Sequence, residues 1–173
     1  MYAVIHGGVD QELRKMSVDY LTSLPFDGHA IGGSVGKDRE EMTILLKFLM
    51  PLLPEEKPIH LLGIADEPSI LASVPLGIDT FDSCFPTRAG RHATVFSTTK
   101  GKLSLTRGKF ARVYEPIDET CDCPACKHHN IAYLHHLFKA HEPSAMVLAT
   151  LHNIHYMCKL MSKIRDDIYL DKI

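Results

Sequence analysis

The feature that most constrains the fold is a fourfold alternation of short apolar runs with helical patterns in the first half of the chain. Each apolar run stops after a few residues, and two of the helical patterns begin at the capping residues Asp10 and Asp38. The expected strands are 3–5, 29–31, 59–64 and 77–82, and the expected helices start near residue 10 and cover 39–49 and 67–74. Short connections in this order predict a parallel sheet with right-handed crossovers.

Polar residues and glycines follow these strands at positions where a purely structural core would have apolar residues. They are His6-Gly7-Gly8, Gly32-Gly33-Ser34, Gly63 and Asp82. Because parallel strands end at one edge of the sheet, where α/β proteins bind ligands, we expect these residues to share a site. Turn formation alone explains most of the glycines. It does not explain Asp82, since an unpaired buried carboxylate is costly.

The second half of the chain begins with a hairpin, expected from 94–97 and 103–106 around Gly101. Basic residues concentrate here: Arg88, Arg91, Lys100, Lys102, Arg107, Lys109 and Arg112. A solvated surface is the usual explanation for such a run, and phosphate binding is the alternative. The position directly after Asp82 favours phosphate binding. Two more helices are expected at about 131–140 and 144–167, the second packed along its length.

Three cysteines lie within six residues, Cys121-Asp-Cys-Pro-Ala-Cys126. The C-x-C and C-x-x-C spacings allow three thiolates to converge, as tetrahedral zinc requires. A fourth ligand is available from a histidine-rich segment: His128, His129, His135, His136, His141, His152 and His155. Disulfides explain the cluster less well, since one cysteine would be left over. Chance clustering of inert thiols is the other alternative.

The length and the composition are those of a soluble globular protein. The chain has 173 residues, enough for one domain with a core, and is 45% hydrophobic and 23% charged. A net charge of −2 gives no general attraction to nucleic acid, so any such contact needs a local basic patch. With neither a signal peptide nor an apolar run of about 20 residues, we expect a cytoplasmic protein without membrane contact. The remaining cysteines, Cys84 and Cys158, are expected to be ordinary buried thiols.

Taken together, these features resemble the C-terminal half of tRNA-guanine transglycosylases (queuine tRNA-ribosyltransferases). The resemblance covers essentially the whole chain. Its pieces are Ile5-His-Gly-Gly, Ala30-Ile-Gly-Gly, Leu62-Gly63, Phe81-Asp-Ser-Cys-Phe-Pro-Thr-Arg88, Cys121-x-Cys-x-x-Cys126 and Leu151-His-Asn153. It implies an α/β fold, the C-terminal half of a TIM-type (β/α)8 barrel of about four β/α units. The half-barrel would cover residues 1–92, and a hairpin with a zinc-binding helical subdomain would cover 93–173.

The resemblance also implies a reaction, the exchange of guanine at the wobble position of tRNA anticodons for a 7-deazaguanine base. Asp82 would be the nucleophile that forms a covalent ribosyl-enzyme, by the two displacements of a retaining glycosidase. The backbone at Gly33 and Gly63 would face the purine. His6 stands where many members have a glutamine that bonds the base. The stretch Ser34–Gly36, one residue shorter than usual, would border the pocket for the side chain of the incoming base.

The remaining roles implied by the resemblance concern tRNA and metal. Arg88 and Arg91 would hold phosphates of the anticodon loop. Cys121, Cys123, Cys126 and His152 would bind a structural zinc ion. His155, one helical turn further on, would be a packing residue or a partner of the zinc ligands; its spacing does not decide between these roles.

The family's other active-site aspartates belong to an N-terminal half that has no counterpart here. The chain is therefore expected to be a fragment, or the product of an internal start at Met1, with little exchange activity alone. Its open flank should favour a homodimer or pairing with the missing half. The alternatives are a non-catalytic tRNA-binding subunit, which would tend to lack Asp82, and a zinc-stapled structural module. The incoming base is queuine or its precursor preQ1.

Overall fold

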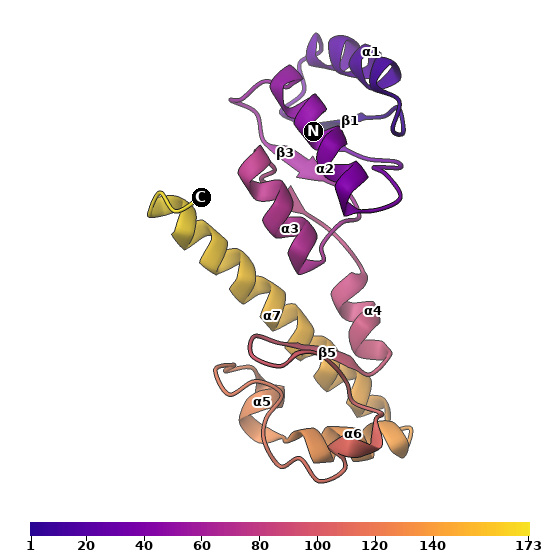
Figure 1. Cartoon of the computed structure of the whole chain (residues 1–173), viewed down its shortest axis with the longest axis vertical. Coiled ribbons are helices and arrows are strands. Elements are labelled where there is room, and N and C mark those ends of the chain that lie inside the picture. Colours follow the sequence, from indigo (N-terminus) through magenta and orange to yellow (C-terminus); the bar gives the residue numbers. More distant parts are fainter. The chain divides into compact units, whose positions relative to one another are not determined.

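A computed structural model describes residues 1–173, which form two compact units, 1–83 and 84–173 (Figure 1). The boundary expected from the sequence, between 92 and 93, lies inside the second unit. The reason is the helix α4 (Phe85–Arg91), which packs against the long helix α7 (Pro143–Tyr169). Gly90 permits this close approach, because a Cβ there would lie 2.8 Å from the backbone nitrogen of Thr150.

The first unit has a four-stranded parallel sheet in the order β1-β2-β3-β4. The strands are β1 (Tyr2–Ile5), β2 (Gly28–Ile31), β3 (Ile59–Leu61) and β4 (Thr80–Phe81). The helices are α1 (Gln11–Thr22), α2 (Arg39–Leu49) and α3 (Glu67–Ser73), with 3-10 turns η1 (Met50–Leu52) and η2 (Val74–Leu76). The predicted parallel α/β arrangement is confirmed. The fourth strand is shorter than predicted, because η2 ends at Gly77 in a left-handed conformation (φ 103°).

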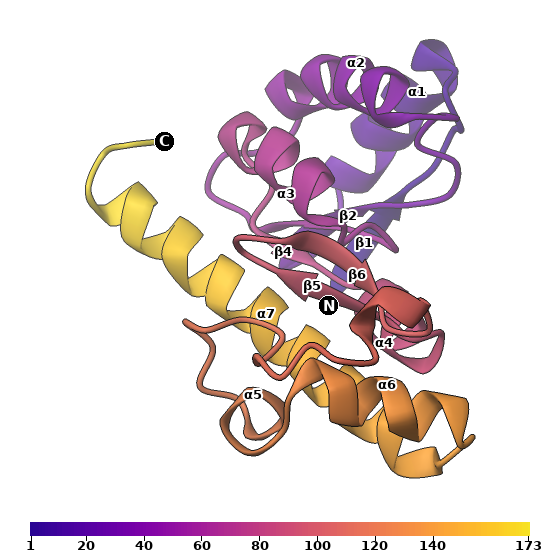
Figure 2. The same cartoon turned by 60° about the horizontal axis from the view of Figure 1, so that its bottom comes forward.

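The core of this unit lies between the sheet and its helices, which cover one face of the sheet (Figure 2). Neighbouring strands contribute Ile5, Ile31 and Leu61 to that face. The predicted stripe on α2, Met42, Leu45, Leu46 and Leu49, is fully buried against them. Helix α1 differs from this pattern, since Leu13, Met16 and Tyr20 are all more than half exposed.

The second unit combines a hairpin with helices. Its elements after α4 are β5 (Thr94–Ser97), β6 (Gly101–Ser104), η3 (Gly108–Phe110), α5 (Pro124–His128), α6 (Ile131–Lys139) and α7. The hairpin and the last two helices were predicted, but the second hairpin strand lies two residues earlier than expected, because Gly101 pairs with Ser97 instead of forming the turn. Helices α4 and α5 were not predicted. The core contains Val95, Leu105, Ile117 and Leu134.

Helix α7 is buried on one side only, contrary to the expectation that it packs along its length. His152 and Asn153 are fully buried, whereas Leu151 and Ile154 are exposed. Cys158 follows Ile154 by one turn and is exposed as well, so the prediction of a buried thiol was wrong there. It was also wrong for Cys84, which is exposed at the start of α4. None of the helices combines the length and the apolar composition that a membrane-spanning helix needs.

Candidate active site and metal centre

The structure brings the predicted base-binding residues and Asp82 to one edge of the sheet. The last residues of the four strands are in register, so the segments that follow them leave the sheet side by side. These segments carry His6, Gly33, Ser34, Gly63 and Asp82. His6 lies next to Gly33, where a Cβ would be 3.3 Å from Nδ1 of the imidazole.

Asp82 is held as an exposed carboxylate. Its side chain is 58% exposed, and Oδ1 accepts a hydrogen bond of 3.0 Å from the backbone N–H of Gly63. Nε2 of His60 lies 3.0 Å from the same oxygen. The Gly63 amide, with the His60 side chain as the second cause, lowers the pKa of Asp82 below its usual value. The group is therefore ionised at neutral pH and reachable from solvent, as a nucleophile must be.

Gly63 can point its amide at Asp82 because of its backbone conformation. Its φ of +75° is left-handed, which glycine adopts without the steric penalty of a Cβ. A turn of this kind directly after β3 directs the N–H to the end of the neighbouring strand β4.

Arg14 fixes the loops that follow β1 and β2. Its side chain is fully buried on α1, and its Nη1 donates to the carbonyl of Ile5 at 2.6 Å. Nη2 donates to the carbonyls of Gly32 (3.0 Å) and Ser34 (2.9 Å), and Nε donates to that of Gly8 (2.8 Å). Burial lowers the pKa of Arg14, yet a guanidinium stays protonated at any physiological pH. One cation thus holds two strand ends of the candidate site.

A pocket of about 250 Å³ lies beside the loop that follows Ser34. Val35, Gly36 and Ile64 form part of its wall, together with Arg39 and Asp66. Nη2 of Arg39 is 3.3 Å from the Asp66 carboxylate, so these two charges compensate each other. The pocket is large enough for a small substituent of a ligand bound at the strand ends.

Arg88 and Arg91 lie on α4 and are exposed. Neither forms an ion pair. Arg88 lines a second pocket, of about 290 Å³, with Phe85, Ala89, His92, Thr94 and Lys102. Because Lys102 also has no carboxylate partner, the pocket carries uncompensated positive charge, which suits an anion.

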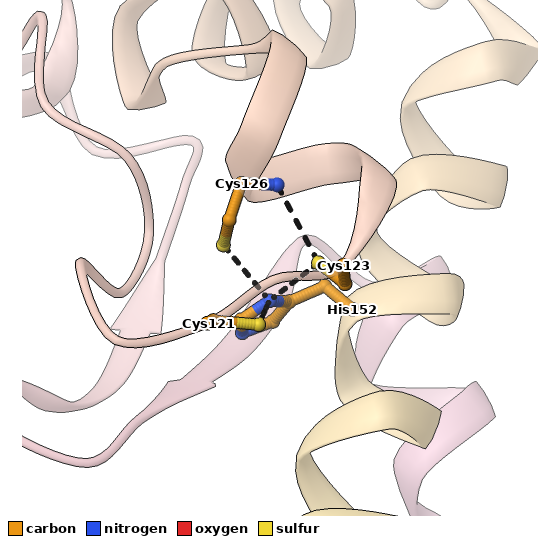
Figure 3. A group of neighbouring side chains, drawn as sticks. All are labelled: Cys121, Cys123, Cys126 and His152. Carbon is orange, nitrogen blue, oxygen red and sulfur yellow. Dashed lines mark hydrogen bonds between the residues drawn. The ribbon is translucent and has the colours of Figure 1, made fainter.

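The predicted metal ligands converge in the second unit (Figure 3). The ligand atoms of Cys121, Cys123, Cys126 and His152 all lie within 4.8 Å of one another. Nδ1 of His152 is 3.7, 3.4 and 3.3 Å from the three sulfur atoms, in that order. A tetrahedral zinc ion with bonds of about 2.3 Å to sulfur and about 2.0 Å to nitrogen would place nitrogen and sulfur about 3.5 Å apart. The four residues therefore could hold a metal ion, and their donor set suits zinc.

The surroundings of the cluster fix its ligands. Nε2 of His152 donates to the carbonyl oxygen of Phe96 at 2.6 Å, which leaves Nδ1 available to a metal. Cys123 caps α5, and its sulfur accepts the N–H of Cys126 at 3.4 Å. Burial raises the pKa of Cys126 and of Cys121, so a cation would be needed to keep these thiols ionised.

The loop that carries the cysteines is tied to α7 by a second set of contacts. Asp122 contacts Nε2 of His155 and Nζ of Lys159, each at 2.8 Å. The Lys159 ammonium, followed by His155, lowers the pKa of Asp122. His155 is thus a partner of the cysteine loop and not a fourth ligand.

Comparison with known proteins identifies the family of this chain. A family model described as queuine tRNA-ribosyltransferase matches residues 1–173. The chain belongs to the queuine tRNA-ribosyltransferase family. Two relatives of that name, from Protochlamydia amoebophila (strain UWE25) and Chlamydia muridarum, are 56% and 47% identical to it over 173 and 174 residues. A third, from Chlamydia caviae, is 45% identical over 174 residues.

The chain spans somewhat less than half the length of these queuine tRNA-ribosyltransferases. All of it is covered in each comparison, but only 44% of the Protochlamydia protein and 46% of the two Chlamydia proteins.

Two residues of these sites, Arg14 and His60, were missed from the sequence, and so was the buried Asp118 near the metal centre. Arg14 follows no motif, although its spacing of four from the buried Val18 placed it on the inner side of α1. His60 becomes visible only once the register of β3 and β4 is known. Asp118 precedes the cysteines, and its burial had no signal in the residues around it.

Proposed function

We propose that this chain provides the nucleophile of a tRNA-guanine transglycosylase. The enzyme would exchange guanine at the wobble position of a tRNA anticodon for a 7-deazaguanine base, queuine or preQ1. The observation that carries the proposal is the ionised, exposed Asp82 at the carboxyl edge of a parallel sheet, with one oxygen held by Gly63. The names of the relatives support the same activity.

The reaction follows from the chemistry of a carboxylate placed beside a nucleoside. An oxygen of Asp82 attacks the anomeric carbon of the ribose, and the glycosidic bond to guanine breaks with its electron pair going to the leaving base. The product is an ester between ribose and Asp82. The incoming base then forms a bond to the same carbon, the ester bond breaks and the carboxylate is restored. Guanine gains one proton and the incoming base loses one, so the exchange is balanced.

Base recognition is assigned to the backbone at the strand ends. Gly33 and Gly63 leave room for a flat purine to approach the main chain, and His6 offers an imidazole nitrogen beside Gly33. The pocket bordered by Val35 and Gly36 would hold the substituent that distinguishes a 7-deazaguanine from guanine.

RNA binding is assigned to the basic face of the second unit. Arg88 and Arg91 would contact phosphates of the anticodon loop, where unpaired guanidinium groups form strong bidentate hydrogen bonds. The pocket lined by Arg88, His92 and Lys102 supports this role, because neither Arg88 nor Lys102 forms an ion pair with a carboxylate.

The metal would be a zinc ion with a structural role. Cys121, Cys123, Cys126 and His152 supply four ligands, so no position is left for a substrate. When bound, the ion would join the cysteine loop to α7.

We also infer that the four strands and three α-helices of residues 1–83 belong to a (β/α)8 barrel that further polypeptide completes. Leu13, Met16 and Tyr20 on α1 support this, because an exposed apolar face of that kind usually packs against a protein partner. A second copy of the chain could cover it as well, which would give a homodimer. The proposed compartment is the cytoplasm, where the tRNA substrate is modified.

Trapping of the covalent intermediate tests the proposed function. The chain is incubated with an anticodon stem-loop RNA that has guanine at the wobble position, alone and together with the remaining part of a full-length relative. Wild type should give an RNA–protein band on a denaturing gel, whereas Asp82→Ala should not. Asp19→Ala, which removes another exposed aspartate, is the control and should give the band.

Two outcomes would count against the proposal. A band that persists in Asp82→Ala would show that another residue reacts. Binding of the RNA without any band, in the presence of the supplementing part, would favour the alternative of a non-catalytic tRNA-binding subunit.

A further inference from the structure

His60 lies beside the proposed nucleophile and had no role in the sequence analysis. It is on β3, in register with Thr80 of β4, and its side chain is partly buried. Nδ1 of its ring is 2.8 Å from the Thr80 hydroxyl, and Nε2 is 3.0 Å from Oδ1 of Asp82. The ring therefore bridges two side chains of the neighbouring strand.

The direction of these hydrogen bonds follows from the charge of Asp82. An ionised carboxylate can only accept, so Nε2 of His60 must carry the proton and donate. In the neutral ring, Nδ1 then accepts from the Thr80 hydroxyl. In the charged ring, Nδ1 donates to the same hydroxyl, which can reverse its role. Thr80 thus holds the ring in one orientation, and Nε2–H points at Asp82 in either protonation state.

The two oxygens of Asp82 differ as a consequence. Both donors, the N–H of Gly63 and Nε2–H of His60, bind Oδ1. Oδ2 accepts no hydrogen bond in the structure. An oxygen without donors keeps more of its electron density for a bond to carbon, so Oδ2 is the better nucleophile of the pair.

We propose that His60 is a positioning residue for Asp82, which with Gly63 fixes Oδ1 and leaves Oδ2 to attack the ribose. This inference rests on the proposed function. In the ester, Oδ2 is bonded to the anomeric carbon and Oδ1 is the carbonyl oxygen. When the incoming base displaces the ester, negative charge returns to the carboxylate, and the two donors on Oδ1 stabilise it as it leaves.

The first experiment needs no turnover. The carboxyl carbon of Asp82 is titrated by NMR in wild type, His60→Leu and His60→Gln. His60→Leu removes the donor and should raise the pKa of Asp82, whereas His60→Gln keeps an N–H at similar reach and should return the pKa toward wild type. Melting curves of the three proteins check that the fold is intact. An unchanged Asp82 pKa in a folded His60→Leu protein would overturn the inference.

The second experiment measures the covalent intermediate in the chain supplemented with the remaining part of a relative. After trapping, 7-deazaguanine is added and the decay of the adduct is followed. His60→Leu should slow the decay on the order of tenfold with RNA affinity unchanged, because one charge-assisted hydrogen bond is lost. His60→Gln should recover most of the rate, and Thr80→Val, which frees the ring, should lie between. Equal decay in His60→Leu and wild type, or no recovery in His60→Gln, would overturn the inference.

Failure of the proposed function and failure of the role of His60 give different results. If Asp82→Ala still forms the adduct, the proposed function is wrong. If Asp82→Ala forms none while the His60 variants match wild type in both experiments, only the positioning role of His60 is wrong. If no adduct forms even with the supplementing part, the pKa of Asp82 in the His60 variants still tests the positioning role of His60.

Discussion

Replacement of Asp118 by alanine should destabilise the second unit strongly, although Asp118 is neither a metal ligand nor part of the proposed active site. Its side chain is 1% exposed. Oδ2 accepts from N (2.6 Å) and Oγ1 (2.6 Å) of Thr98 and from Oγ of Ser97 (3.2 Å). Oδ1 accepts from N (3.0 Å) and Oγ1 (2.7 Å) of Thr120. The carboxylate therefore joins the hairpin turn to the start of the cysteine loop.

The size of the effect can be worked out from these contacts. The hydroxyl groups can turn to other acceptors, but the two backbone N–H groups cannot. Both hydrogen bonds are partly buried and end on a charged group, which makes each worth about 1.5–3 kcal/mol, so Asp118→Ala should lower the free energy of unfolding by about 4 kcal/mol. For a chain of this size, that corresponds to a fall in melting temperature of roughly 8–16 °C.

The charge of Asp118 adds a pH dependence. Burial acts to raise the pKa of Asp118, but the hydrogen bonds from Thr98 and Thr120 together outweigh it and hold the pKa well below its usual range. The folded-state pKa is therefore below the unfolded value of about 3.9. The stabilisation is complete above about pH 4 and is lost as the pH falls toward the folded-state pKa. The difference in the free energy of unfolding between wild type and Asp118→Asn should accordingly become smaller below about pH 4.

The assay is calorimetry between pH 3 and pH 7 with the metal content of each sample measured, because protonation of cysteine ligands releases zinc at low pH from wild type and variants alike. Asp166→Ala is the matched control, because Asp166 is exposed on α7 and should change the free energy of unfolding by less than about 0.5 kcal/mol. A decrease in the free energy of unfolding of less than about 1 kcal/mol in Asp118→Ala would refute the proposed role of the hydrogen bonds. A difference between wild type and Asp118→Asn that stays constant over the whole pH range would refute the proposed role of the charge.

Three further predictions concern the metal and the packing. Cys123→Ala should lose bound metal and become protease-sensitive, since structural zinc contributes folding energy directly; unchanged metal content and melting temperature would disprove the ligand assignment. Gly90→Ala should lower the melting temperature by several degrees, because its Cβ would lie 2.8 Å from a backbone nitrogen of α7. The control Gly108→Ala should leave the melting temperature unchanged, because its Cβ would meet no atom within 4 Å. Equal melting temperatures of the two variants would contradict the close packing of α4. Arg14→Met should lower the free energy of unfolding in urea by about 3–5 kcal/mol, because four carbonyl oxygens lose the guanidinium as a donor. The control Lys15→Met, at an exposed position, should lower it by less than about 0.5 kcal/mol, and similar losses in both variants would contradict the role of Arg14.

The parts of the fold that were predictable depend on local signals. Helix α2 was predicted with its bounds, cap and buried stripe, because an Asp cap and a 3.6-residue period lie within one segment. Helix α4 was missed, since it has only seven residues, lacks a side-chain cap and contains Gly90, which lowers helix propensity. Tertiary contacts stabilise it instead: Nδ2 of Asn153 donates to the carbonyls of Pro86 (3.0 Å) and Thr94 (2.9 Å).

In the candidate sites, too, local signals could be predicted from the sequence and tertiary contacts could not. The spacing of the three cysteines predicted their convergence, because all three lie in one turn. His152 could not be chosen from among seven histidines by spacing, since its place depends on how α7 packs against β5. His60 acts on Asp82 only through the pairing of two strands, and exposure of Leu13 depends on what covers α1. Such non-local information is not readable from a single sequence.

The central claim is that Asp82 bonds to the ribose of the RNA. Mass spectrometry of the trapped complex tests it most directly, after digestion with nuclease and protease. The peptide containing Asp82 is expected to carry the mass of a ribose-linked nucleotide remnant, attached at Asp82 itself. A remnant on any other residue of this chain, or on the supplementing part alone, would contradict it.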